Sequence, residues 1–257
     1  MRFKIGIIGY GNVGGSIAEF FEKKKRKVLV LTSKNLKSRE FVKFYKYNEI
    51  ESFLENTNVI LICIRDDKIE NIVEILKNYN LTNKIVYHTS GSLTSDILKP
   101  ITKAYIGSLH PIQTFPKINY KLLRNIYFSF EGQKFSIAKK LATFFNSKVI
   151  RIKKEKKVLY HIACIFASNF SNLLWIISEK MIKESTNKDF KILHPLVKTT
   201  LNNALIYGTK DALTGPARRG DYKLIEEHLN FLKNYNLDTY NVYKSLSQII
   251  ISQLKID

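Results

Sequence analysis

The sequence predicts an α/β protein in which a doubly wound, mostly parallel sheet is followed by an all-helical region. Three observations support this prediction. Short apolar runs alternate with helical segments as far as Lys153, which is typical of stacked βα units. A glycine-rich turn joins the first apolar run to the first helical segment. After Lys153 only long helical periodicity remains, so we place a domain boundary between residues 153 and 154.

Each apolar run is predicted to be a strand because it is short and rich in β-branched or aromatic residues. The predicted strands cover residues 4–9, 28–32, 59–64, 84–88, 104–108, 127–130 and 149–152. Helices are expected at 14–22, near 52, at 67–79 and at 135–145. Residues 1–153 are therefore expected to form one sheet domain with helices between its strands.

The second part, residues 154–257, is predicted to be a helical domain that binds substrate or forms a dimer. Its apolar residues recur at helical spacing in four long segments. These segments cover residues 156–184, 193–207, 223–235 and 239–254.

The composition is that of an ordinary folded protein with an unusual charge. The chain has 257 residues, 45% hydrophobic and 25% charged, which excludes a disordered or fibrous protein. Its formal net charge of +20 suggests an anionic partner, such as a nucleic acid or a phosphorylated ligand. A solvated basic surface is the alternative, because the lysines are scattered. No helix-turn-helix, RNA-recognition motif or arginine-rich arm is evident, so no nucleic-acid partner is predicted.

The cysteines and the N-terminus favour a cytoplasmic protein. Cys63 and Cys164 lie in separate apolar segments, without the spacing of a disulfide framework or a zinc site, so no metal is predicted. Glycines interrupt the N-terminal apolar stretch, which argues against a signal peptide.

One apolar segment, residues 158–177, has the length of a membrane span. Polar residues inside it, including His161, Asn169 and Asn172, would be costly in lipid. We therefore expect a buried helix and no membrane partner. A homodimer, or burial within one chain, would explain its apolar face equally well.

The turn at residues 9–14 matches G-x-G-x-x-G. It follows a strand and opens a helix, which is the placement that a dinucleotide-binding turn requires. Gly9 would permit the tight turn, Gly11 the approach of the pyrophosphate, and Gly14 the packing of helix on strand. The helix N-terminus would present its amides to the phosphates. The predicted cofactor-binding residues of this turn are Gly9, Tyr10, Gly11, Asn12, Val13 and Gly14.

The end of the second predicted strand indicates which dinucleotide binds. An NAD site has Asp or Glu about twenty residues after the turn, where it binds the ribose 2′-OH. Here the sequence has Thr32, Ser33 and Lys34, with further basic residues up to Arg39 and no acid before it. Hydroxyls and cations suit a 2′-phosphate, so we predict NADP (NADPH) as the cofactor. An ordinary polar loop with its lysines facing water is the alternative.

Polar residues also follow the next predicted strand, where Ile64, Arg65 and Asp66 are expected to pass over the cofactor. Segments 88–92 and 108–113 follow the two strands after it and carry small polar groups and histidines. Because carboxyl ends of parallel strands share one edge, these segments are expected to form a site together.

Within those segments, Ser90 and His110 are predicted to bind substrate. Two structural alternatives remain open. Ser90 or Ser92 could cap a helix running to Leu98. His88 and His110 could each be a hydrogen-bonded core histidine.

The first long helix of the second part carries a polar stripe. At about 100° per residue, Lys157, His161, Ser168 and Asn172 fall on one face, with Asn169 beside it. Polar groups on an apolar helix need a cleft or hydrogen-bonding partners. The stripe therefore predicts a catalytic face, and a polar network that packs helices together is the alternative.

A glycine-proline loop at residues 214–221 precedes another predicted helix. Asp221 is placed to cap that helix. Arg218 or Arg219 could hold a substrate carboxylate through two hydrogen bonds.

Taken together, these motifs resemble the two-domain NADP-binding reductases related to ketopantoate reductase, pyrroline-5-carboxylate reductase and the deazaflavin-dependent NADP oxidoreductases. The closest resemblance is to a family with a Rossmann-like domain followed by a helical domain of unknown function. The residues that carry the resemblance lie at 9–14, 88–91, 108–111, 160–169 and 215–221. It implies an alternative form of ketopantoate reductase, acting in pantothenate biosynthesis. Ketopantoate reductases use an early lysine of the helical domain, for which Lys157 or Lys156 could stand, and a late glutamate that has no clear match here.

The leading hypothesis is an NADPH-dependent reductase of a small 2-oxo acid, with ketopantoate as first choice. His161 or Lys157 would protonate the developing alkoxide. The predicted catalytic residues are His161, Lys157, Asn169 and Asp221, and the predicted substrate-binding residues are Ser90, His110, Arg218 and Arg219. The alternatives are a reductase of imines or one linked to a deazaflavin, and a non-catalytic regulator that binds NADP or nucleic acid. A cytoplasmic homodimer is expected.

Overall fold

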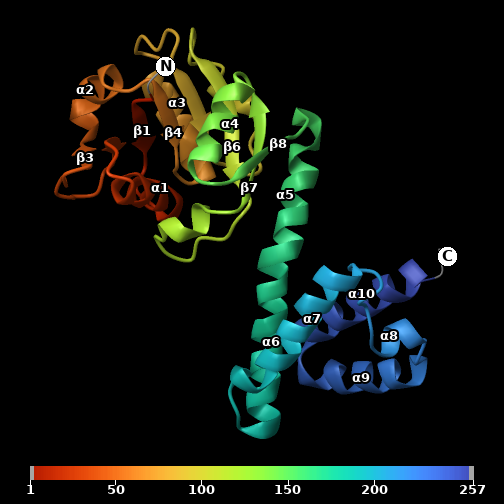
Figure 1. The fold of residues 1–257 in the computed structure, drawn as a ribbon. Coiled ribbons are helices and arrows are strands. Elements are labelled where there is room, and N and C mark those ends of the chain that lie inside the picture. Colours follow the sequence, from red (N-terminus) through yellow and green to blue (C-terminus); the bar gives the residue numbers. More distant parts are fainter. Residues whose placement is uncertain (1–2, 255–257) are drawn as a thin grey trace. The chain divides into compact units, whose positions relative to one another are not determined.

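The computed structural model describes residues 3–254 of the chain. These residues form two compact units that divide between Asn169 and Phe170 (Figure 1). The first unit contains the sheet and the second is helical. The predicted fold class, a Rossmann-type α/β domain followed by a helical region, is therefore confirmed.

The first unit is built on a sheet with eight strands in the described part of the chain. The strand order is β3-β2-β1-β4-β5-β6-β7-β8. All neighbours run parallel except β6 and β7, which are antiparallel. The first six positions reproduce the order of a doubly wound dinucleotide-binding sheet. The strands are β1 (Ile5–Ile8), β2 (Val28–Leu31), β3 (Val42–Tyr45), β4 (Val59–Ile62), β5 (Ile85–His88), β6 (Tyr105–Pro111), β7 (Tyr127–Gly132) and β8 (Lys148–Arg151).

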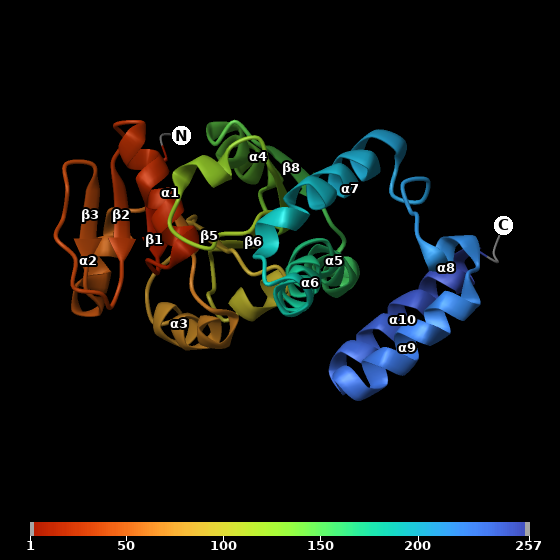
Figure 2. The ribbon, with the colours of Figure 1, turned by 90° about the horizontal axis from the view of Figure 1, so that it is seen from below.

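Helices cover both faces of this sheet (Figure 2). Helices α1 (Asn12–Lys23) and α4 (Phe135–Phe144) pack on one face. Helices α2 (Ile50–Glu55) and α3 (Ile69–Leu76) pack on the other face, together with the 3₁₀ turn η3 (Ser95–Leu98). The remaining 3₁₀ turns of the unit are η1 (Tyr47–Glu49), η2 (Asp66–Lys68), η4 (Tyr120–Leu123) and η5 (Lys154–Lys156).

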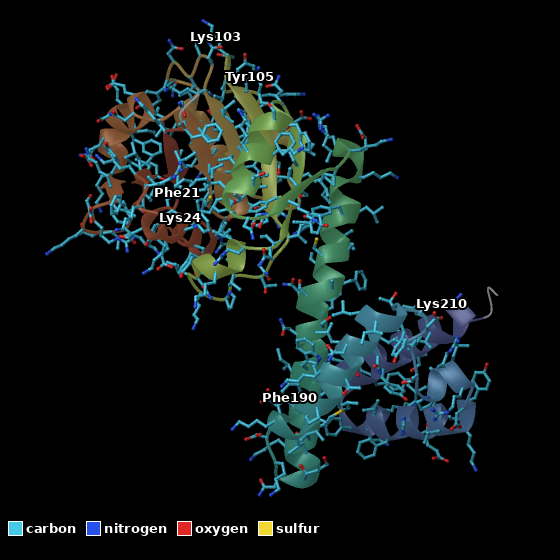
Figure 3. All side chains as sticks on the ribbon, viewed as in Figure 1. Phe21, Lys24, Lys103, Tyr105, Phe190 and Lys210 are labelled. Atoms are coloured by element: carbon cyan, nitrogen blue, oxygen red, sulfur yellow. The ribbon has the colours of Figure 1, made fainter. Side chains whose placement is uncertain are left out.

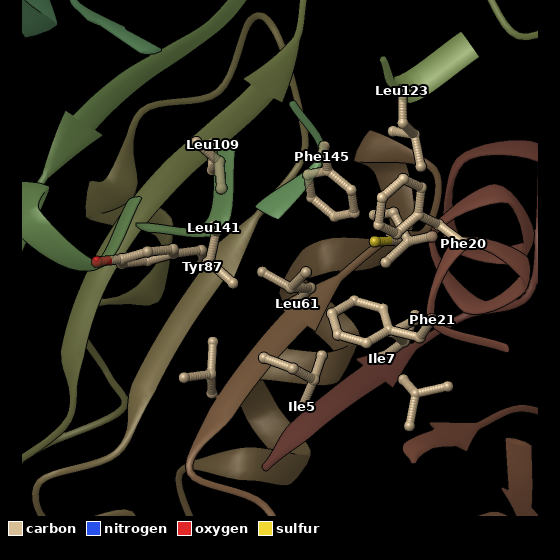
Figure 4. Close-up of a cluster of buried hydrophobic side chains, with 14 of the residues drawn as sticks. Ile5, Ile7, Phe20, Phe21, Leu61, Tyr87, Leu109, Leu123, Leu141 and Phe145 are labelled. Carbon is tan, nitrogen blue, oxygen red and sulfur yellow. The ribbon is translucent and has the colours of Figure 1, made fainter. Parts of the chain in front are cut away.

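Alternation along the strands divides the core into two layers. Ile5 and Ile7 belong to the layer under α1 and α4, whereas Ile8 belongs to the layer on the opposite face. Aromatic rings fill the first layer (Figure 4). The ring of Phe145 meets Phe20 edge-on at 4.9 Å between centroids and stacks on Phe128 at 5.7 Å. Through these contacts the C-terminal end of α4 packs against α1 and the sheet.

The lysine-rich segment that begins at Lys23 marks the end of α1. Phe21 lies inside the core, whereas Lys24, one residue past the last helical position, is exposed (Figure 3). Lys25 adopts a left-handed backbone conformation with φ of 51°, which turns the chain toward β2.

All seven predicted strands are confirmed, and β3 is the strand that the sequence analysis missed. Its four residues, Val-Lys-Phe-Tyr, form no continuous apolar run. It is an edge strand, so only one side pairs, with β2. The prediction of a helix running to Leu98 is wrong, because only the 3₁₀ turn η3 forms there. The N-cap of this turn is Thr94, and not Ser90 or Ser92.

The second unit consists of helices and connecting segments, with no strand among its described residues. The four long helical segments expected from periodicity are confirmed. Asp221 caps α9 by accepting a hydrogen bond from the Leu224 amide at 3.3 Å, as expected. His228 Nδ1 and the Tyr243 hydroxyl, 2.7 Å apart, join α9 to α10. The helices are α6 (Ser171–Thr186), α7 (His194–Tyr207), α8 (Pro216–Arg219), α9 (Tyr222–Tyr235) and α10 (Leu237–Leu254), with the 3₁₀ turn η7 (Phe190–Leu193).

Helix α5 (Lys157–Ile165) follows β8 and belongs to the first unit. The sequence boundary at Lys153 marks the end of the strand pattern, but the compact units divide later. The reason is that Lys157 and Tyr160, on the first turns of α5, hydrogen-bond to β6. A π-helical turn (Phe166–Phe170) separates α5 from α6, so the 100° spacing assumed for the polar stripe does not continue through it.

The apolar segment 158–177, for which burial was expected, is not buried within the described chain. Val158 and Leu159 are 61% and 62% exposed, and Phe166 is 60% exposed. By length and composition, one described helix, Lys154–Thr186, could cross a membrane, with a mean hydropathy of 1.3. The homodimer that would cover this apolar face stays a prediction.

Phe145→Ala should destabilise the first unit by about 3–5 kcal/mol, because it removes the ring contacts with Phe20 and Phe128 and leaves a cavity. Urea unfolding followed by circular dichroism measures the change. Ile150→Ala, at a residue of β8 that is 40% exposed, is the control and should cost about 1 kcal/mol or less. Equal effects of the two variants would contradict the assigned core.

Candidate functional site

The turn after β1 has glycine at two positions where a side chain would not fit and at one position that is open. Gly9 has φ of 101°, and a Cβ there would lie 2.6 Å from the Cys63 carbonyl oxygen. A Cβ on Gly14 would lie 3.1 Å from the Cys63 side chain and 3.2 Å from Ile7, so this glycine allows α1 to pack closely on β1 and β4. A Cβ on Gly11 would meet nothing within 4 Å. The backbone is thus open at the position where a pyrophosphate would approach.

The start of α1 supplies donors at this opening. Gly11 is the N-cap, and no side chain caps the first-turn amides. The Asn12 side chain instead donates to the Phe115 carbonyl at 2.8 Å, and Ser16 accepts from the Asn119 amide at 2.9 Å. These bonds tie the helix to the loop between β6 and β7. The first-turn amides therefore remain available for an anion.

Three cationic side chains gather at the end of β2. Lys34 Nζ donates to the Tyr10 carbonyl at 2.8 Å, and Lys46 Nζ donates to the Lys34 carbonyl at 2.8 Å. Arg39 donates to the Tyr10 hydroxyl at 3.2 Å and pairs with Glu22 at 3.0 Å. Thr32 is buried and accepts from the Lys34 amide, while Ser33 is exposed. This arrangement fits a phosphate better than a neutral ribose hydroxyl.

Asp66 joins the loops that follow β4 and β5. Its Oδ2 accepts from Ser90 Oγ at 2.7 Å and from Ser92 Oγ at 2.8 Å. Ser90 Oγ also accepts from the Ser92 and Leu93 amides. Ser90 therefore orders its own loop. Arg65 is exposed and pairs with Asp67 at 3.0 Å, and Ile64 packs partly buried against the core.

His88 is a buried histidine at the end of β5. Its Nδ1 accepts from the Ser90 amide at 3.2 Å, and its Nε2 lies 3.2 Å from the Thr94 carbonyl. These partners assign the proton of a neutral ring to Nε2. Burial, followed by the nearby Lys157 charge, lowers the pKa of His88 to about 4. Both ring nitrogens of His88 thus have hydrogen-bond partners, which supports the interpretation of His88 as a hydrogen-bonded core histidine.

A buried lysine is the central feature of the site. Lys157 is 0% exposed, and its Nζ donates to Ser108 Oγ at 2.6 Å. Ser108 Oγ in turn donates to the Ser90 carbonyl at 3.1 Å. Burial lowers the pKa of Lys157 to about 8, against the opposing influence of Glu131 and Asp66. Lys156 is exposed, so Lys157 is the lysine that the fold directs inward.

Two aromatic side chains of α5, Tyr160 and His161, lie beside His110 of β6. The Tyr160 hydroxyl lies 2.7 Å from His110 Nδ1, and burial raises the pKa of Tyr160. The His110 and His161 rings meet edge-on at 5.9 Å between centroids. Burial, followed by Lys157, lowers the pKa of His110 to about 4. A Cβ on Gly91 would lie 2.9 Å from His161 Nε2 and 3.0 Å from His110 Nε2, so both imidazoles reach this glycine.

The register of the sheet shows why these groups meet. Ile8, Ile62, His88 and Ser108 are partners on successive strands, from β1 to β6. The glycine turn begins directly after Ile8, and Lys157 bonds to Ser108. The turn and the buried lysine therefore lie at the same carboxyl edge, on strand positions Ile8 and Ser108 that are about 14 Å apart across three strand spacings.

The structure brings together some of the predicted site residues. Lys157, His161, His110 and Ser90 form one cluster, and the turn and Lys34 form another. Asn169 lies two turns beyond His161, where its side chain accepts from Ser168 at 2.9 Å. Arg218, Arg219 and Asp221 belong to the second unit, in or next to α8.

Sequence reasoning missed several residues of the cluster. Tyr160, Ser108 and Gly91 lie in segments that it did single out, but they received no role. Glu131 and its partner Ser95 were missed entirely. A signal for Glu131 exists, because it is the one charged residue of the β7 segment Tyr-Phe-Ser-Phe-Glu-Gly.

Comparison with known families agrees with the two-part architecture. Residues 1–111 match the profile of a Rossmann-like domain. The N-terminal domain is Rossmann-like. Residues 126–250 match a domain of unknown function, DUF2520. A search of curated proteins gives no significant match.

Solved structures of similar fold cover nearly the whole chain. A Bacteroides fragilis protein provisionally described as an NADP oxidoreductase has a TM-score of 0.78 at 22% identity, covering 98% of each chain. A Plasmodium falciparum pyrroline carboxylate reductase with NADP bound has a TM-score of 0.62 at 17% identity, covering 97% of this chain and 98% of the other. An Aspergillus terreus reductive aminase in complex with NADPH has a TM-score of 0.72 at 11% identity, covering 98% of this chain and 95% of the other. These likenesses show a shared fold.

The two buried histidines should make stability depend on pH. The pKa values of His88 and His110 are about 4 in the folded chain and about 6.5 when unfolded. Between these values the unfolded state binds more protons, so the free energy of unfolding should fall as the pH is lowered from about 6.5 to 4. Urea unfolding across this range measures the slope. His88→Gln should reduce it, and an unchanged slope in that variant would contradict the assignment.

Proposed function

We propose that this protein is an NADPH-dependent reductase that adds hydride to a polarised C=O or C=N bond of a small molecule. One observation carries the proposal: a dinucleotide-type turn and a desolvated lysine lie at the same carboxyl edge of one doubly wound sheet. Ligands of such sheets bind outside this edge. A dinucleotide on the turn would extend toward the Lys157 cluster.

The choice of NADPH rests on the end of β2. Lys34, Arg39 and Lys46 lie together near the end of β2, and the segment from Thr32 to Arg39 contains no acid. A 2′-phosphate would gain charge-assisted hydrogen bonds there. The NADP and NADPH named in the structures of similar fold support the same choice.

The bound cofactor would supply the hydride, and Lys157 would supply the proton. Nζ has three N–H bonds, of which one is used by Ser108, so the others would be the donors to a substrate oxygen or nitrogen. With its pKa lowered to about 8, the amine is mostly protonated at neutral pH and close to the working pH, as an efficient general acid requires. His161 and the neutral His110 would hydrogen-bond to the substrate beside Gly91. In a carbonyl reduction, the carbon gains hydride and the oxygen gains the Lys157 proton.

The substrate class is a small 2-oxo acid, with ketopantoate as the first compound to test. A substrate carboxylate would be held by cationic groups, for which Arg218 and Arg219 are the candidates. A cyclic imine is the second class, and the pyrroline carboxylate reductase and reductive aminase of similar fold favour it.

Loss of NADPH absorbance tests the activity, with ketopantoate, other 2-oxo acids and cyclic imines supplied separately. Substrate-dependent oxidation of NADPH, with NADH poor, is the expected result. Activity on imines that survives Arg218→Ala and Arg219→Ala would move the assignment to the imine class. NADPH binding without turnover of any of these compounds would contradict a reductase.

Lys157→Met should lower kcat by about 100- to 10,000-fold, because it removes the proton donor but keeps an unbranched side chain of similar size. Turnover of the wild-type protein should fall as the pH rises through about 8, where Lys157 loses its proton. Lys156→Met, at the exposed neighbour, is the matched control and should retain activity. Equal losses in the two variants would contradict the role of Lys157.

Lys34→Glu should raise the KM for NADPH about tenfold or more and leave the KM for NADH nearly unchanged, because a carboxylate there would repel the 2′-phosphate. Steady-state kinetics with each cofactor measure the split. Lys140→Glu, an equal change of charge at an exposed residue of α4, should change neither constant. A similar change of both KM values in Lys34→Glu would contradict the phosphate site.

A further inference from the structure

The Lys157 amine has a buried acidic neighbour on the adjacent strand. Ser108, which accepts from Lys157, lies on β6 directly opposite Glu131 of β7 in the antiparallel register. Directly opposed residues of an antiparallel pair project to the same face. Glu131 is only 8% exposed, and Lys157 is 0% exposed. Both charges are therefore enclosed on one face of the sheet.

The carboxylate of Glu131 is held in place by another residue. Ser95, at the start of η3, donates to it from its amide at 2.7 Å and from its hydroxyl at 2.6 Å. One bond goes to each carboxylate oxygen, and together they stabilise the negative charge in the interior. Since Lys157 bonds to Ser108 and Glu131 bonds to Ser95, the two charges act on each other through space.

We propose that Glu131 is the positioning residue that keeps Lys157 protonated at the working pH of the enzyme. This inference rests on the proposed role of Lys157 as proton donor. A buried amine alone would tend to lose its proton, because burial disfavours the charged form. A fixed carboxylate across the strand pair opposes that loss without an ion pair that would occupy the amine. The Lys157 N–H bonds not used by Ser108 thus stay available to a substrate.

The other groups around Lys157 fit this assignment. Asp66, from the loop after β4, also favours the protonated amine, but less than Glu131 does, and its carboxylate accepts from Ser90 and Ser92. His88 on β5 and His110 on β6 have pKa values near 4 and are neutral at working pH. Tyr160 and His161 lie on the same helix as Lys157, and the pKa of Tyr160 is raised. Glu131 is therefore the main countercharge.

The test measures the protonation of Lys157 without relying on turnover. In protein labelled with ¹³C at the lysine ε carbons, the Lys157 signal should titrate near pH 8, and Lys157→Met would assign that signal. Glu131→Gln should lower the Lys157 pKa by about one unit or more. The alkaline limb of the kcat profile should move by the same amount in the same direction. Glu131→Met removes the charge without an amide and gives the same test if the glutamine variant does not fold.

Ser95→Ala is the matched control, because it removes one hydrogen bond to Glu131 but keeps the carboxylate. It should not lower the pKa of Lys157. An unchanged titration in Glu131→Gln, or an equal fall in Ser95→Ala, would overturn the proposal. A lowered pKa in a protein that reduces no substrate would instead retain Glu131 as the countercharge and reject the proposed function.

Discussion

The burial of one amine against the sheet is the constraint on which the rest of the site depends. Lys157 can be enclosed only if its charge has partners, since an isolated buried ammonium is strongly disfavoured. Ser108 supplies a hydrogen bond, and Glu131 and Asp66 supply negative charge. Each of these acids is in turn held by serine hydroxyls, Glu131 by Ser95 and Asp66 by Ser90 and Ser92. The loops that follow β4 and β5 are ordered by the same bonds.

This constraint also explains where the first unit ends. α5 belongs to the sheet domain although the strand pattern stops at Lys153, because its first turns carry Lys157, Tyr160 and His161 into the cluster. The residues between them, Val158 and Leu159, point outward and are exposed. One helix thus presents a polar face to the site and an apolar face away from it.

The sequence predicts the sheet domain well because its signals are local. The alternating runs, the Gly9–Gly14 turn and the missing acid after β2 each depend on a few neighbouring residues. The cluster is harder to predict because its contacts are distant in the chain. Glu131 lies opposite Ser108 through the β6–β7 register, whereas Lys157 reaches Ser108 from α5. Tyr160 contacts His110, which lies fifty residues away in the chain. β3 was missed since an edge strand needs no continuous apolar run.

In the helical part, the sequence predicts the helices but not which of their faces are buried. Its helices follow from periodicity, and the Asp221 cap follows from local capping chemistry. The predicted polar stripe does not continue along one face beyond His161, because a π-helical turn interrupts the helix. No spacing rule predicts such a turn. The exposed apolar segment could not be predicted either, since composition alone does not distinguish a buried helix from an exposed one.

A crystal structure with NADPH bound tests the central claim most directly. The account predicts the pyrophosphate on the amides of the Gly9–Gly14 turn, the 2′-phosphate beside Lys34, and the nicotinamide facing Lys157 and His161 at the carboxyl edge of β5 and β6. A nicotinamide that lies away from Lys157, or an adenosine phosphate away from Lys34, would contradict it.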